Sequence, residues 1–167
     1  MLGEANKHLT LDVESMEKLV PTAGSLLTVG SVIAGFGVAM LFFRIQRELH
    51  MHRKGERIWI PWADWLLTSA TVLALLVILL PILLLGPETL VARSLATAAG
   101  SASVIMVSGY VFAILAHYRL IFGRKRKGSR ENPEPAEAGV VVTSIILAVA
   151  AAITSYLGVW ECVAARM

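Results

Sequence analysis

The chain has 167 residues, of which 56% are hydrophobic and 16% charged, and its formal net charge at pH 7 is +3. Because a soluble domain carries about 25% charged residues, this composition excludes an ordinary water-soluble domain and indicates an integral membrane protein. The single cysteine, Cys162, excludes an intrachain disulfide and any CxxC redox or metal motif.

Four long and largely uncharged runs predict an all-α, polytopic membrane protein with four transmembrane helices. A helix needs about 20 apolar residues to cross about 30 Å of hydrocarbon, and each run reaches that length. Strands of a transmembrane barrel would alternate apolar and polar residues over about ten positions, and these runs do not. The predicted transmembrane helices comprise residues 20–43, 62–86, 93–121 and 137–161.

The first 20 residues are predicted to form a segment separate from the bundle of residues 21–167. Leu9, Val13 and Met16 share one helical face, so a short amphipathic helix is expected there, lying on the membrane or against the bundle. Acidic residues replace the basic start of a cleavable signal peptide, which argues against such a peptide.

The first transmembrane helix is rich in small residues. Gly30 and Ser31 stand four positions before another small residue, a spacing that lets two helix backbones approach closely. This pattern fits packing within one chain and packing between chains equally well. The candidates for pore lining or helix packing are Thr28, Gly30, Ser31 and Gly35, followed at the end of the helix by Arg44 and Arg47.

The second transmembrane helix begins in tryptophans and continues in aliphatic residues. Trp59, Trp62 and Trp65 recur every three residues and, with Trp160, are predicted to anchor the bundle at the membrane surfaces. The alternative is a cation–π site for a quaternary ammonium ligand. The run from Val72 to Leu85 is nearly all leucine, isoleucine and valine, so this helix is expected to be the most exposed to lipid.

Pro81 interrupts that aliphatic run. Proline has no N–H group and its ring collides with the carbonyl four residues earlier, so a kink is expected.

Two connections, residues 44–60 and 119–136, are predicted to be basic loops. They hold 11 of the 15 lysines and arginines of the chain. By the positive-inside rule both loops lie in the cytoplasm and both termini lie outside. The location expected from this pattern is a prokaryotic inner membrane.

Ionisable residues of this chain stand near predicted helix ends rather than at mid-membrane. Asp64 is expected to pair with an arginine such as Arg57 or to cap its helix, and binding of a cationic ligand is the alternative. His50 and His52 lack further ligands, so no metal site is predicted. Residues expected to meet lipid headgroups, anionic ones above all, are His117, Arg119, Arg124, Lys125, Arg126 and Lys127.

Three classes of function follow from these patterns. The favoured one is a non-enzymatic, homo-oligomeric channel-like or pore-like assembly, in which Arg44 and Arg47 would form a ring that favours anions. The second is an accessory or scaffold subunit of a larger membrane complex. The third is a membrane enzyme acting on lipophilic substrates through Asp64, His117 and Arg119. Membrane lipids and further copies of the chain are the expected partners; nucleic acid, cofactors and catalytic residues are not predicted.

Overall fold

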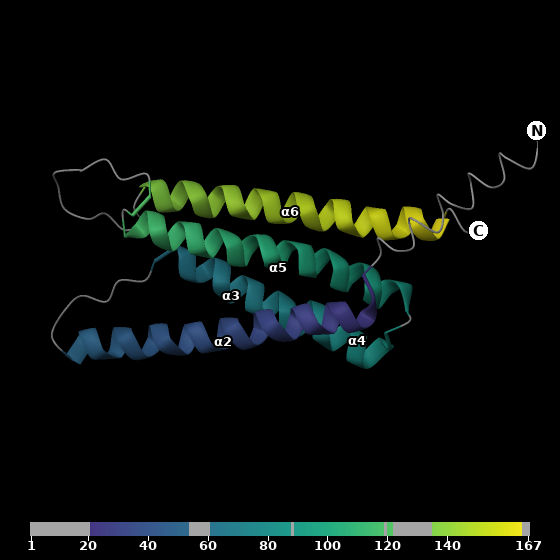
Figure 1. Ribbon diagram of the computed structural model, residues 1–167, viewed down its shortest axis with the longest axis horizontal. Coiled ribbons are helices and arrows are strands. Elements are labelled where there is room, and N and C mark those ends of the chain that lie inside the picture. The colour runs from purple at the N-terminus through teal and green to yellow at the C-terminus, as the bar shows by residue number, and fades with distance from the viewer. Residues whose placement is uncertain (1–20, 54–60, 88, 119, 122–134, 165–167) are drawn as a thin grey trace, which may run out of the picture.

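The regular structure of the described residues is entirely helical. The computed structural model describes residues 21–53, 61–87, 89–118, 120–121 and 135–164. The amphipathic helix predicted within residues 1–20 therefore lies outside the described residues. The helical elements are α2 (Ala23–Arg53), α3 (Ala63–Leu73), η1 (Ala74–Leu79), α4 (Leu80–Leu85), α5 (Leu90–His117) and α6 (Pro135–Ala164) (Figure 1).

These elements make four helices that are long and apolar enough to span a membrane, because α3, η1 and α4 follow one another without a break. The prediction of a four-helix membrane protein is confirmed. The first helix is longer than expected: α2 continues to Arg53, so much of the stretch predicted as the first basic loop is helical.

The central helix of the bundle is α5. It packs along α6 on one side and along α3 and η1 on the other, and α2 packs against α3 and η1 (Figure 1). Buried apolar residues form two clusters along the bundle. One includes Ile33, Ala74 and Ile78, and the other includes Leu66, Leu67, Tyr110 and Val141.

The expectation that the second transmembrane helix is the most exposed to lipid is wrong. In its most apolar stretch 39% of the residues are buried, against 28% for the first helix and 17% for α6, which is the most exposed. The reason is a stripe at helical spacing (Ala63, Leu66, Ala70, Ala74 and Ile78) that is buried against its neighbours. Only the opposite face, with residues such as Leu76 and Leu83, is exposed.

A π-helical turn, η1, ends two residues before Pro81, next to the position where a kink is expected from sequence. The N–H of Leu80 donates to the carbonyl of Leu75, five residues earlier, instead of four. Such wider turns are an established cause of helix bending.

Glycines allow two close approaches between helices. A Cβ placed on Gly37 of α2 would lie 1.9 Å from Oγ1 of Thr71 in α3. A Cβ placed on Gly109 of α5 would lie 2.1 Å from Oγ and 2.5 Å from Cβ of Ser144 in α6. These separations are far shorter than van der Waals contact, so both helix pairs depend on the missing side chain.

Candidate functional site

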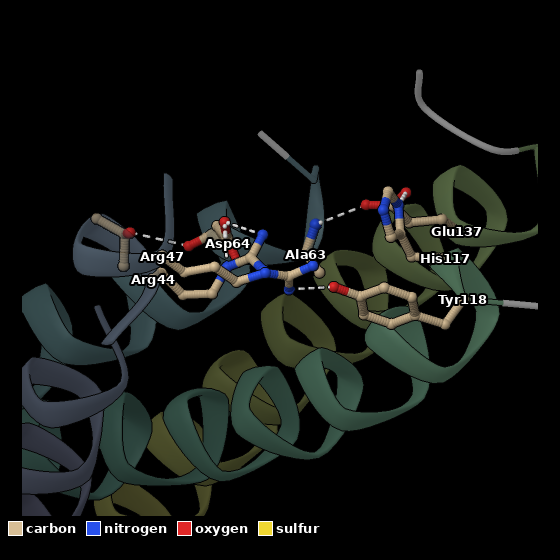
Figure 2. Close-up of polar contacts among 8 residues, drawn as sticks. Arg44, Arg47, Ala63, Asp64, His117, Tyr118 and Glu137 are labelled. Carbon is tan, nitrogen blue, oxygen red and sulfur yellow. Dashed lines mark hydrogen bonds and ion pairs between the residues drawn. The ribbon is translucent and has the colours of Figure 1, made fainter. Parts of the chain in front are cut away.

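Polar side chains from all four transmembrane helices meet at the end of the bundle where α3 begins (Figure 2). In a membrane protein, ionisable residues inside a helical bundle are the first candidates for function. We call this group the polar cluster; it comprises Arg44, Arg47, Asp64, His117, Tyr118 and Glu137 and the backbone of Ala63.

The first ion pair of the polar cluster joins α2 to α3. Nε and Nη2 of Arg44 both donate to Oδ2 of Asp64, at 3.2 and 3.1 Å, and the two side chains are only 13% and 15% exposed. The partner is therefore Arg44, which precedes Asp64 by 20 residues; Arg57, the partner proposed from sequence, lies outside the described residues. Oδ1 of Asp64 is buried and accepts no hydrogen bond from any described residue.

The second pair joins α5 to α6. Nδ1 of His117 lies 2.7 Å from Oε2 of Glu137, and both side chains are buried. These two atoms share one hydrogen bond between α5 and α6. The other oxygen, Oε1, accepts the N–H of Ala63 at 3.0 Å. This N–H belongs to the first turn of α3 and has no partner within its own helix, so Glu137 caps α3 from another helix.

Arg47 and Tyr118 form the third connection. Nη1 of Arg47 donates to the hydroxyl of Tyr118, and its guanidinium carbon lies 5.6 Å from the centre of the ring. Tyr118 also packs edge-on against His117, with ring centres 5.1 Å apart. The three connections are therefore neighbours in space, as Figure 2 shows.

Local sequence explains these positions. Arg44 and Arg47 are three residues apart and share one face of the extended α2. Asp64 and Glu137 each lie in the first turn of their helices, where a negative charge is favoured by the helix dipole. His117 ends α5, where a positive charge would be favoured.

Sequence reasoning singled out Asp64, Arg44, Arg47 and His117 and expected an arginine as the partner of Asp64. It placed Arg44 and Arg47 at a pore and His117 at lipid headgroups rather than in this cluster. The lipid-headgroup role predicted for His117 is at odds with its position, because its ring is buried and bonds to Glu137. Glu137 itself was missed. The available signal was an acidic residue shortly after Pro135, at the start of an otherwise apolar run.

The pore-lining or packing candidates divide between two faces of α2. Gly30 is buried, and a Cβ there would lie 2.9 Å from Cγ2 of Ile78. Thr28, Ser31 and Gly35 are exposed. The hydroxyl of Thr28 donates a hydrogen bond to the carbonyl of Gly24, and a Cβ on Gly35 would have no neighbour within 4 Å.

The tryptophan anchors occupy both ends of the bundle. Trp62 and Trp65 are exposed beside the start of α3, and Trp160 is exposed near the end of α6. Trp59 and the basic candidates Arg119, Arg124, Lys125, Arg126 and Lys127 lie outside the described residues.

Across the part of the chain that the structure describes, no three His, Cys, Asp or Glu side chains come together as metal ligands would. Chemically, the polar cluster pairs two carboxylates with arginine and histidine and ties all four helices together. No known protein family, curated protein sequence or solved structure matches the chain.

Proposed function

We propose that the chain is a non-enzymatic membrane protein that associates with further copies of itself through the outward face of α2, forming a channel-like assembly. Thr28, Ser31 and Gly35 are the residues assigned to this face. They supply small side chains for close helix approach and hydroxyl groups for an uncharged pathway.

The observation that carries the proposal is the difference between the two faces of α2. The inward face, with Gly30 and Gly37, is filled by Ile78 and Thr71 of the same chain. On the outward face, Gly35 has open space where a side chain would stand, and Thr28 and Ser31 are exposed. Small residues let another helix approach closely, and hydroxyl groups can hydrogen-bond to it. Packing against another helix therefore stabilises such a face more than contact with lipid does.

The arginines Arg44 and Arg47 of α2 are not assigned a role in selecting ions. Arg44 is neutralised by Asp64 inside the chain, and Arg47 bonds to Tyr118. A preference for anions is therefore not assigned to the assembly. The pathway is proposed to be uncharged along α2.

The proposed orientation places both termini outside and the basic connections in the cytoplasm of a prokaryotic inner membrane. It is supported by the distribution of lysine and arginine, of which 11 of 15 lie in residues 44–60 and 119–136. The run Arg124–Lys127 would then meet anionic lipids of the inner leaflet.

Native mass spectrometry from lipid nanodiscs tests the assembly. The wild-type chain is expected to give one closed oligomer of four or more copies, and Gly35→Leu is expected to reduce it to monomers. Gly139→Leu is the matched control, because a Cβ on Gly139 of α6 also has no neighbour within 4 Å.

Each other outcome has a definite meaning. Unchanged stoichiometry in Gly35→Leu removes α2 as the interface, and dissociation in Gly139→Leu alone moves the interface to α6. A wild-type monomer or dimer favours the accessory-subunit alternative. A trimer that retains a lipophilic cofactor favours the enzyme alternative.

A further inference from the structure

A second feature lies at the opposite end of the bundle from the polar cluster. There the start of α2, the first half of α5 and the end of α6 line an open groove with a volume of about 660 Å³. This volume is typical of sites that bind small molecules, which measure about 300–1,000 Å³. We call it the α2–α6 crevice; its lining includes Pro21, Leu26, Val29, Ser101, Val104 and Gly158.

The walls of the α2–α6 crevice are apolar with a few hydroxyl groups. Ser101 and Ser155 line it but are already engaged: Ser155 donates to Ser101, and Ser101 donates to carbonyls of α5 and α6. Thr97 donates to the carbonyl of Arg93. The lining thus offers mainly apolar contact, which suits a hydrocarbon chain.

A positive charge stands at the rim. Nη2 of Arg93 donates to the carbonyl of Pro21, a lining residue, at 3.4 Å. Among the described residues no carboxylate pairs with Arg93. A guanidinium held beside an apolar cavity is complementary to a phosphate that carries an acyl chain.

The depth of the α2–α6 crevice matches one leaflet of the membrane. From Arg93 at the rim to Ile105 at the far end of the lining, α5 rises about 18 Å. One leaflet contributes half of about 30 Å of hydrocarbon. A phosphate at Arg93 would therefore lie at the headgroup level while an acyl chain extends to the end of the crevice.

We propose that the α2–α6 crevice binds one phospholipid per chain, with its phosphate at Arg93 and an acyl chain between α2, α5 and α6. This inference does not depend on the proposed assembly, because the crevice is built within one chain. Occupation by phospholipid would join α2 to α6, which otherwise contact α5 separately.

The test is native mass spectrometry of delipidated, full-length protein titrated with palmitoyl-oleoyl phosphatidylglycerol. The wild-type chain is expected to bind one lipid per copy. Gly158→Leu places an aliphatic side chain in the crevice, where a Cβ meets no atom within 4 Å. If it displaces about two methylene groups of the acyl chain, affinity falls about tenfold.

Gly139→Leu is the matched control, because it lies on the same helix, is equally open and does not line the crevice. It should bind lipid as the wild type does, whereas Arg93→Gln should bind more weakly. Equal lipid binding by Gly158→Leu and wild type would overturn the proposal. A Gly158→Leu variant with altered stoichiometry and unchanged lipid binding would identify the crevice as a protein interface instead.

A second measurement needs no variant. Cys162 lines the crevice and is the only cysteine of the chain. Its reaction with a membrane-soluble maleimide should be slower in lipid-loaded than in delipidated protein. Equal rates, or equal protection by inorganic phosphate alone, would argue against a bound acyl chain. The mass spectra of the lipid titration also report the number of protein copies. Loss of lipid binding can therefore be distinguished from loss of the proposed assembly.

Discussion

Glu137 and His117 form a buried pair, 2.7 Å between Oε2 and Nδ1, that joins the start of α6 to the end of α5. The same carboxylate caps α3 through the N–H of Ala63. One side chain therefore holds three of the four transmembrane helices at this end of the bundle.

Glu137→Ala should destabilise the fold by about 3 kcal/mol, because it removes the buried partner of the His117 ring and the acceptor of the Ala63 N–H. The free energy of unfolding can be measured by titration with sodium dodecyl sulfate in mixed micelles. Glu161→Ala, an exposed acid on the same helix, should change it by less than about 0.5 kcal/mol. A loss in Glu137→Ala no greater than in this control would contradict the role assigned to the pair.

Asp64→Asn and Arg44→Met should each weaken the bundle, because each leaves one partly buried charge without its counter-charge. We expect losses of about 2 kcal/mol apiece and a smaller-than-additive loss in the double variant. Arg53→Met removes an exposed arginine from the same helix and serves as control. Strict additivity in the double variant would show that the two side chains do not interact.

Gly109→Ala should separate α5 from α6, since its Cβ would lie 2.5 Å from Cβ of Ser144. Overpacking of this kind costs about 1–3 kcal/mol. Thermal unfolding in detergent, followed by circular dichroism, measures the effect. Adding Ser144→Gly removes the clashing atoms and should restore part of the stability, whereas Gly139→Ala should leave the wild-type value. Full stability of Gly109→Ala alone would show that the helices pack less closely than described.

The proposed orientation can be tested with single cysteines in a Cys162→Ser background. A cysteine in place of Ala165, near the C-terminus, should react with a membrane-impermeant maleimide in intact cells. A cysteine in place of Ser129, in the second basic connection, should react only after permeabilisation. The reverse pattern would show that the positive-inside rule does not set the topology here.

Hydropathy and run length were sufficient to predict the four spans, because crossing the membrane demands a long apolar helix whatever surrounds it. They were insufficient to rank exposure. The leucine-rich composition of the second span concealed a stripe from Ala63 to Ile78 that is buried, because lipid and protein interior accept the same residues.

Partners within the polar cluster could not be derived from sequence. The pairing of Arg44 with Asp64 depends on the course of α2 beyond the apolar run that ended at Phe43, and α2 continues ten residues past it. Gly30 and Gly35 stand in similar sequence surroundings, yet only Gly30 lies against another helix. Because an α-helix has 3.6 residues per turn, two positions five residues apart lie on different faces.

The cap that Glu137 gives to α3 comes from α6, which is synthesised after the other three described membrane helices. Until α6 has been made and inserted, the hydrogen bonds that Glu137 makes with the N–H of Ala63 and with the ring of His117 cannot form. A nascent chain that ends before α6 therefore has the other three described helices but not the hydrogen bonds that Glu137 supplies. Insertion of α6 adds these hydrogen bonds, so α3, α5 and α6 are joined through Glu137 only after α6 has been synthesised.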